Sequence, residues 1–364
     1  MRIGVHRMAM SNPADVSGLR ALVDSGEIDP AAIVAGIGKT EGNGGANDFT
    51  RALATNSFAE YLGQVLDQPS GAITERIAFV WSGGCEGVLS PHVTLFTRHD
   101  EAAEGGEPRL ALSVQRTRDF LPEEVGRLPE VDEVAAAVRR GLDDLAVKGS
   151  DVHYVQVKGP LLTPAGLADA RARGAEVVTE DPNRSKAYAR GATALGVALG
   201  LGQIHPDALT QDAIARDMAL YSDVASTSAG GELTSCEILL FANSSSATGD
   251  YRIGHGVLED AIDLRGVKSA LRNAGLTFDC EPEPLQQDRI AAVFAKAEAP
   301  VAGVLRGSRT TMLSDADINY ERHARAAVGA VIASMTGDPR IFVSGGTEHQ
   351  CAPGAAPIAA IVRA

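Results

Sequence analysis

The sequence has few cysteines and no long apolar run. Its four cysteines form no CxxC pair and are too scattered for a disulfide framework, so we expect reduced thiols. No apolar run approaches the ~20 residues of a membrane-spanning helix, and the N-terminal residues lack the apolar region of a signal peptide. These absences indicate a cytoplasmic protein with no membrane partner.

Positive charge and zinc-type histidine spacing are also missing. The net charge is -14, and no Lys/Arg run offers the counterion-releasing surface that nucleic acids and anionic membranes require. General nucleic-acid binding is therefore excluded, and an anionic ligand must be held by a local cluster. Since no HxH or HExxH spacing marks a zinc site, we interpret His92, His255 and His349 as structural hydrogen-bonding residues.

What the sequence does contain is one motif used three times. A serine is followed by a small residue, a glycine, any residue and a glutamate, at Ser82–Glu86, Ser228–Glu232 and Ser344–Glu348. Each copy follows apolar, strand-like sequence. Because 364 residues exceed the usual size of a single core, the motif suggests one structural unit repeated three times.

Each expected unit orders its parts in the same way. The apolar pattern predicts a strand, a helix, a strand carrying lysine, a helix with arginine, a strand leading to the serine motif, and a last strand. We expect α/β (α+β) units over 1–103, 109–248 and 251–364, arranged as three structurally similar domains with pseudo-three-fold symmetry around one central active site. The Lys/Arg/Ser positions are 39/51/82, 158/190/228 and 296/322/344.

These residue types suit amide chemistry if they converge. A lysine that is partly out of water and close to other cations has a lowered pKa, and a neutral lysine can act as general base toward a serine hydroxyl. Consecutive backbone N–H groups in the serine loops can hold a carbonyl oxygen. Three such sets suit a small planar ligand with three carbonyls. The alternative is that the loops are ordinary tight turns and the lysines are solvated.

The chain resembles a known family along essentially its whole length. The resemblance rests on long motifs in the same order, namely residues 38–44 (GKTEGNG), 82–92 (SGGCEGVLSPH), 251–255 (YRIGH) and 344–350 (SGGTEHQ). These motifs are similar to those of the cyanuric acid hydrolase/barbiturase family of ring-opening cyclic amide hydrolases. The resemblance implies three similar domains around one site, and a homotetramer.

The resemblance also implies roles for individual residues. Ser228 would be the nucleophile and Lys158 its base. The remaining residues would bind the substrate, and the implied set is Lys39, Arg51, Ser82, Gly83, Arg190, Ser228, Ala229, Lys296, Arg322, Ser344 and Gly345. Three converging lysines cannot all lose a proton without weakening the field that lowers each pKa, so we expect Lys158 alone to be neutral.

No cofactor for catalysis is implied, but a structural divalent cation, Mg²⁺ or Ca²⁺, is. The implied ligands lie in the third unit and are Glu298, Thr347, Gln350, Cys351, Ala352 and Ala355. The sequence departs from the family pattern here, because Cys351-Ala352 stands where Gly-Pro is usual and Ala355-Ala356 replaces glycines. Main-chain carbonyl ligands tolerate such changes.

Three functions stay open at this point. The first is hydrolytic opening of the s-triazine ring of cyanuric acid to carboxybiuret, which decarboxylates to biuret. The second is conversion of barbiturate to ureidomalonate, although Arg190 and the third loop, Ser344–His349, favour cyanuric acid. The third is non-catalytic binding of a planar cyclic imide anion.

Overall fold

The computed structural model describes residues 1–101, 105–300, 303–311 and 320–364. Within them the chain forms three four-stranded sheets and one small hairpin. The strands of the first sheet are β1 (Arg2–Ala9), β2 (Ile33–Thr40), β3 (Ala78–Gly83) and β4 (His92–His99); those of the second are β5 (Arg109–Arg116), β6 (Val152–Pro160), β7 (Ala225–Gly230) and β8 (Glu237–Ser244); those of the third are β9 (Tyr251–Leu258), β10 (Ile290–Ala297), β13 (Phe342–Gly345) and β14 (Ala356–Arg363).

All three sheets have one topology. The strand order is first, fourth, second, third, with only the second and third strands parallel. The second strand of each sheet carries a register shift near its start, at Ile33/Ala35, Val152/Tyr154 and Ile290/Ala292. The predicted fold of three similar α/β units is confirmed.

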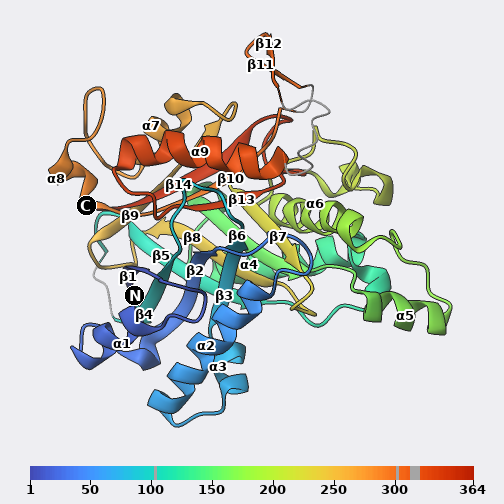
Figure 1. Ribbon diagram of the computed structural model, residues 1–364, viewed down its shortest axis with the longest axis horizontal. Helices are drawn as coiled ribbons and strands as arrows, with labels where there is room; N and C mark the ends of the chain where they lie inside the picture. Colours follow the sequence, from blue (N-terminus) through green and yellow to red (C-terminus); the bar gives the residue numbers. More distant parts are fainter. Residues whose placement is uncertain (102–104, 301–302, 312–319) are drawn as a thin grey trace.

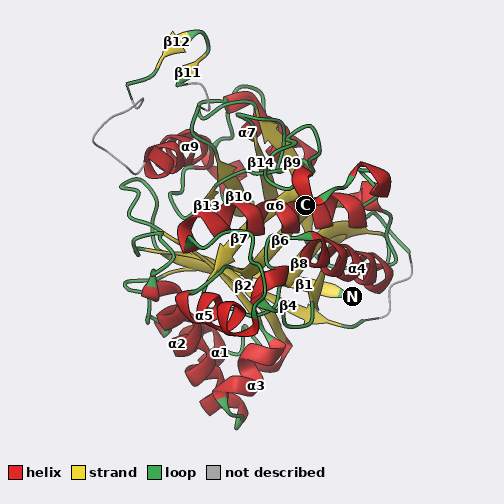
Figure 2. Ribbon diagram, turned by 90° about the vertical axis from the view of Figure 1, so that its right-hand side faces the viewer, coloured by secondary structure: helices red, strands yellow, loops and turns green. Residues whose placement is uncertain are grey.

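Helices connect the strands at equivalent points. The first and second strands of each sheet are joined through α1 (Ser17–Asp24), α4 (Leu128–Leu145) and α7 (Leu264–Asn273). The parallel strands are joined through α2 (Phe49–Leu66), α6 (Pro182–Gly200) and α9 (Tyr320–Thr336), as a crossover between parallel strands requires. Figures 1 and 2 show the sheets in the middle of the molecule with helices outside them.

Some short elements were not predicted from the sequence. They are α3 (Ser70–Arg76), α5 (Pro164–Arg173), α8 (Pro284–Gln287), and the hairpin of β11 (Val304–Leu305) and β12 (Ser308–Arg309), which projects from the body in Figures 1 and 2. All four lie outside the repeated strand–helix plan, so the motif that reveals the repeat gives no signal for them.

The three sheets share one aromatic core. Phe96 of β4, Phe241 of β8 and Phe294 of β10 form a triangle with ring centroids 5.1, 6.1 and 6.3 Å apart, and Tyr154 of β6 stacks on Phe294 at 5.4 Å. All four side chains are buried. Because one ring comes from each sheet, this contact sets how the sheets face one another.

Each sheet takes all its strands from one consecutive stretch of chain, but the domain limits stay a prediction. The expected boundary at residue 103 lies outside the described residues. The amino group of Met1 donates to the carbonyl of Ser246 at 3.1 Å, which ties the N-terminus to the connection between the second and third sheets.

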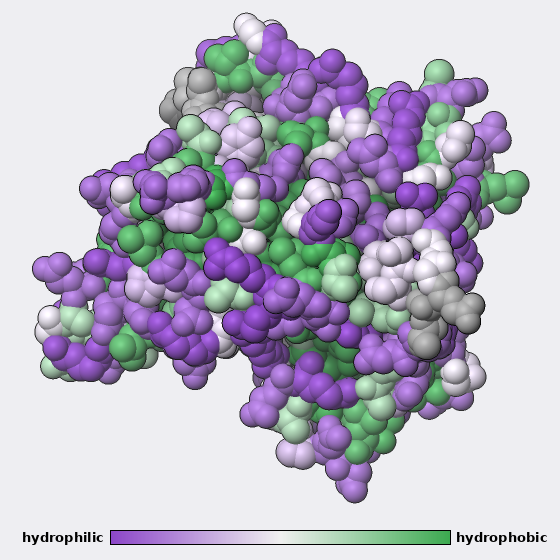
Figure 3. Space-filling model, turned by 180° about the vertical axis from the view of Figure 1, so that it is seen from behind, coloured by the Kyte–Doolittle hydropathy of each residue, from purple (hydrophilic) through white to green (hydrophobic). Residues whose placement is uncertain are grey.

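Three further observations concern the surface, the helices and the cysteines. The face shown in Figure 3 is largely hydrophilic, with apolar residues visible mainly toward its middle. In the described part of the chain, no helix has both the length and the apolar character needed to cross a bilayer. All four cysteines are free thiols, as predicted.

We expect Phe294→Ala to destabilise the protein by about 3–5 kcal/mol, because it removes a buried ring that touches all three sheets. Urea unfolding checks this. Phe294→Leu should cost less because most of the volume is kept, and Leu285→Ala, at a side chain that is 82% exposed, should change stability by less than about 0.5 kcal/mol. Equal midpoints for Phe294→Ala and Leu285→Ala would contradict this role of the aromatic core.

Candidate active site

Strand register brings each lysine opposite one serine. On the three parallel strand pairs the Cα partners are Lys39 and Ser82, Lys158 and Ser228, and Lys296 and Ser344. Partners on adjacent strands project from the same face of a sheet, so each lysine lies beside its serine. The repeated order of lysine and serine in the sequence is thus a repeated structural pair.

The three pairs surround one small cavity, with a volume of about 50 Å³. It collects residues from all three sheets and their crossover helices. Of the predicted residues, those that line it are Arg51, Ser82, Gly83, Lys158, Arg190, Ser228, Ala229, Ser344 and Gly345. Lys39 and Lys296 are buried next to this lining, where their ammonium groups donate to the carbonyls of Gly84 and Gly345.

The prediction of Arg322 is wrong. The arginine of the third crossover helix that lines the cavity is Arg325, whereas Arg322 is half-buried and donates to the carbonyl of Asn43 at 2.6 Å. Both precede the apolar part of α9. They lie three residues apart on one helix. The rotation of α9 about its own axis decides which of them faces inward, and the sequence pattern does not give this rotation.

The three inward arginines form a cyclic set of ion pairs with the glutamates of the serine motifs. Each arginine reaches the motif of the next sheet. Arg51 pairs with Glu232 at 3.2 Å, Arg190 pairs with Glu348 through two contacts of 2.6 and 2.7 Å, and Arg325 pairs with Glu86. The glutamates had no predicted role, although their fixed offset from the serines was the available signal.

The tight approach of Arg190 explains one glycine. Gly346 has a φ of +80°, and a Cβ there would lie 2.4 Å from the guanidinium carbon of Arg190. A side chain at this position would be strained and would also displace the arginine from Glu348. The second glycine of this motif is therefore required by the ion pair as well as by the turn.

The three lysines have unequal partners. Lys39 contacts Glu86 at 2.5 Å and Lys158 contacts Glu232 at 3.0 Å. Among the described residues, Lys296 contacts no carboxylate. Its ammonium donates to the carbonyls of Thr227 and Gly345, at 2.7 and 2.9 Å, and to Ser344 Oγ at 3.3 Å.

Burial lowers the pKa of all three lysines, because water is lost around the charged form. For Lys39 and Lys158 the partner carboxylate acts in the opposite direction. For Lys296 the burial, reinforced by the Arg190 guanidinium, lowers the pKa to about 7. The structure therefore does not single out Lys158 as the neutral lysine, and in the arrangement seen Lys296 loses its proton readily.

The serines differ as well. Ser82 Oγ donates to the carbonyl of Val343 at 2.7 Å, and Ser344 Oγ accepts from Lys296. Ser228 Oγ is buried, and within the described part of the chain it has no hydrogen-bond partner. Since an unpartnered buried hydroxyl is costly, Ser228 is the serine whose hydroxyl is left for a ligand.

Sequence reasoning missed two charged residues that line the cavity, Lys186 and Glu321. Each precedes an inward arginine by four residues on the same helix, in the pairs 186/190 and 321/325, so both project from the arginine's face. Burial and the Arg190 guanidinium lower the pKa of Lys186. The helical spacing was the signal that could have revealed them.

Five of the predicted metal ligands lie in the loop between β13 and β14, Glu298 directly after β10 contacts this loop, and their chemistry fits a hard cation. Glu298 accepts from the backbone N–H of Thr347 at 3.1 Å and from its hydroxyl. Burial raises the pKa of the Glu298 carboxyl, and it forms no ion pair with a described residue. A carboxylate beside loop oxygens is a donor set for Mg²⁺ or Ca²⁺. We propose that Glu298 holds such an ion with the loop oxygens of Thr347, Gln350, Cys351, Ala352 and Ala355.

This loop also contacts β7, the strand that carries Ser228, and the segment before it. Gln350 Oε1 accepts from the backbone N–H of Thr227 at 2.7 Å, and Cys351 N–H donates to the carbonyl of Ser222 at 3.0 Å. Cys351 has a φ of +74°, a conformation that favours glycine. Described residues form no cluster of three or more His, Cys, Asp or Glu side chains suited to a metal ion, so backbone and amide oxygens would have to supply most ligands.

The three histidines act in hydrogen bonding, as predicted. His92 Nδ1 contacts the carbonyl of Ser90 at 2.8 Å, and burial lowers its pKa to about 4. His349 bridges the carbonyl of Leu220 and the N–H of Ala215. His255 contacts His153 through their Nδ1 atoms at 2.9 Å.

Comparisons with known proteins agree with this geometry. A family model described as "Amidohydrolase ring-opening protein" matches residues 4–363. A "Cyclic amide hydrolase" of Azorhizobium caulinodans is 66% identical and a "Cyanuric acid amidohydrolase" of Enterobacter cloacae is 50% identical, each with 100% of both chains covered. A solved structure described as "Cyanuric acid hydrolase: evolutionary innovation by structural concatenation" is 47% identical with a TM-score of 0.93, over 100% of this chain and 99% of that one.

The fold and the site thus define an enzyme of the cyclic amide hydrolase class. The match over nearly the whole chain makes the assignment specific: the protein belongs to the family of ring-opening amidohydrolases.

We expect added Mg²⁺ or Ca²⁺ to raise the melting temperature, because an ion bound only by the folded chain stabilises it by about 2.7 kcal/mol at 100 times its Kd. Glu298→Gln should abolish this rise. Glu281→Gln, which changes an exposed carboxylate between α7 and β10, should keep it. Scanning calorimetry with and without EDTA measures the effect. Identical wild-type melting in both buffers would rule out the ion.

Proposed function

We propose that the protein hydrolyses cyanuric acid, a planar ring with three carbonyls. The observation that carries this proposal is that one small cavity is surrounded by three equivalent sets of groups. Each set consists of a serine, the backbone N–H of the residue after it, and an inward-facing arginine. Each set can hold one carbonyl oxygen, and three buried arginines favour a ligand that gains negative charge. Relatives at 66% and 50% identity are named for cyclic amide and cyanuric acid hydrolysis.

Ser228 is the proposed nucleophile, supported by its unpartnered buried hydroxyl. Its Oγ attacks a ring carbonyl carbon and passes its proton to neutral Lys158. The C–O bond forms, the ring C–N bond breaks, and the leaving nitrogen takes the proton from Lys158. In the second half of the reaction water gives a proton to Lys158 while its oxygen attacks the acyl carbon. The ester bond to Ser228 breaks, Lys158 passes this proton to Ser228 Oγ, and carboxybiuret leaves and decarboxylates to biuret.

Lys158 must lose its proton before it can act in this way. In the structure its ammonium is held by Glu232 at 3.0 Å, so the resting lysine is charged. On this proposal kcat/KM falls as the pH drops through the lowered pKa of Lys158. Lys39 and Lys296, each beside its paired serine, Ser82 and Ser344, would interact with the other two carbonyl oxygens of the substrate.

Two other functions use the same residues. Barbiturate has a ring CH₂ where cyanuric acid has its third ring N–H. Arg190 lines the cavity and donates two hydrogen bonds to Glu348, and its presence there supports cyanuric acid as the ligand. A non-catalytic binder of imide anions would need no free nucleophile. Parallel assays of cyanuric and barbituric acid separate the three. The implied homotetramer stays a prediction for sedimentation analysis.

Ser228→Ala and Lys158→Ala should each reduce turnover of cyanuric acid by at least about 1,000-fold, because members of a nucleophile–base pair act as one unit. Ser82→Ala, at the equivalent position of the first sheet, should retain more activity. Mass spectrometry of enzyme quenched during turnover should find the acyl group on the peptide containing Ser228. An adduct on Ser82 or Ser344 would reject the assignment.

Arg190→Ala and Arg325→Ala should each lower kcat/KM roughly 100-fold or more, since each removes a buried cation that lines the cavity. Arg322→Ala is the matched control on the same helix as Arg325. Among the described residues it loses a contact to a backbone carbonyl, and it should cost less than about tenfold. Steady-state kinetics on the three variants test this order, and an Arg322→Ala enzyme as impaired as Arg325→Ala would restore the original assignment.

A further inference from the structure

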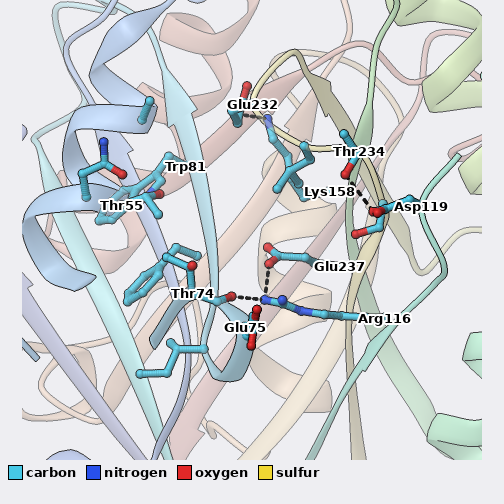
Figure 4. A pocket seen from close by; sticks show the side chains of 16 residues that line it. Thr55, Thr74, Glu75, Trp81, Arg116, Asp119, Lys158, Glu232, Thr234 and Glu237 are labelled. Atoms are coloured by element: carbon cyan, nitrogen blue, oxygen red, sulfur yellow. Dashed lines mark hydrogen bonds and ion pairs between the residues drawn. The ribbon is translucent and has the colours of Figure 1, made fainter. Parts of the chain in front are cut away.

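A second cavity, of about 420 Å³, lies beside the central one, between the first and second sheets. Lys158 and Trp81 line both cavities, and Glu232 lines the second. Figure 4 shows the side chains that line this second cavity, with Lys158 and Glu232 in the upper part of the view and the pair Glu237 and Arg116 below them. The buried side chain of the proposed base therefore faces a second cavity as well as the central one.

Register places four polar residues in one row across the second sheet. From the edge strand inward, Arg116 is the partner of Glu237, Glu237 of Lys158, and Lys158 of Ser228. Cross-strand partners share a face and lie about 4.5–5.5 Å apart. The row leads from the candidate nucleophile, through the candidate base, to a carboxylate on the second cavity.

The other two sheets lack this row. Opposite Lys39 stands His92, whose own partner is Ala9. In the third sheet Ala295 is opposite Ile358, which puts Pro357 opposite Lys296, and Val257 follows. Of the three sheets, only the second places a carboxylate opposite its lysine on the fourth strand. The same sheet carries Ser228, whose hydroxyl has no described hydrogen-bond partner.

The second cavity surrounds Glu237 with charge of both signs. Arg116 donates to its carboxylate at 2.5 Å and to the carbonyl of Thr74. Lys158 and Glu232 approach from the central side, and the cavity wall adds Glu75 and Asp119. Burial outweighs the two cations and raises the pKa of Glu237 to about 7, so the carboxyl group can both accept and release a proton near neutral pH.

We propose that Glu237 is a positioning residue for proton exchange, which links Lys158 to water in the cavity between the first and second sheets. This rests on the proposed function, in which Lys158 starts charged, and in which the carboxyl group of the product ionises by giving its proton to Lys158 at the end of each turnover. The Lys158 ammonium gives its proton to the Glu237 carboxylate, through cavity water, and becomes the neutral base. Glu237 then releases that proton to cavity water and returns to the carboxylate.

The test compares Glu237→Gln with wild type on cyanuric acid across pH. The expected result is a kcat lowered roughly 10- to 100-fold, with KM changed less than about twofold, because substrate contacts are untouched. Formate or imidazole should restore turnover to Glu237→Ala in proportion to its concentration, and should not accelerate wild type. Thermal melting confirms that each variant is folded.

Two matched controls separate this role from a structural one. Arg116→Gln breaks the same ion pair but keeps the carboxylate, and His92→Gln changes the equivalent position of the first sheet; neither should become dependent on added formate. The inference would be overturned if Arg116→Gln lowered kcat as much as Glu237→Gln does and if formate and imidazole failed to rescue Glu237→Ala. So would a Glu237→Gln enzyme with normal kcat and only an acid limb shifted to lower pH, since that is the electrostatic effect of a lost negative charge.

The two proposals fail in different ways. If Ser228→Ala keeps full turnover, the proposed function fails and the inference fails with it. If Ser228→Ala is inactive while Glu237→Gln behaves as wild type, the proposed function stands and the proton route through Glu237 is rejected.

Discussion

The pairing register of the parallel strands is the constraint on which the site depends. In each sheet it sets a lysine opposite a serine, and a slip by one residue would send one of the two side chains to the other face. The antiparallel fourth strand fixes the same register from the other side, with the bulge at the start of the second strand. The aromatic triangle then holds the three sheets so that their serine loops meet.

The ion pairs between sheets complete the site and make it a joint property of all three. Each inward arginine pairs with the serine-motif glutamate of the next sheet, so no sheet can form its part alone. Buried ion pairs gain little net stability, since desolvation offsets their attraction. Their presence in every repeat is better explained by function: they fix three guanidinium groups around the central cavity.

Much of this could be read from the sequence, because it is carried by strand ends and fixed offsets. The three sheets, the lysine–serine pairs and the positions of Arg51 and Arg190 follow from periodicity and a repeated motif. The choice of Arg325 over Arg322 could not, since it depends on how α9 is turned against its sheet. The lowered pKa of Lys296 could not either, because it results from burial of the ammonium group and from the nearby Arg190 guanidinium, which depend on the three-dimensional structure.

The three-fold design also explains why its repeats must differ in detail. A symmetric ligand needs three equal sets of donors, but one nucleophile needs one base with a way to exchange its proton. The first and third sheets place His92 and Pro357 behind their lysines and occupy their serine hydroxyls. Of the three sheets, only the second combines a serine hydroxyl without a described hydrogen-bond partner with a carboxylate opposite the lysine. The three sheets share one backbone plan and differ in these side chains, and on the proposed function this difference sets which sheet supplies the nucleophile.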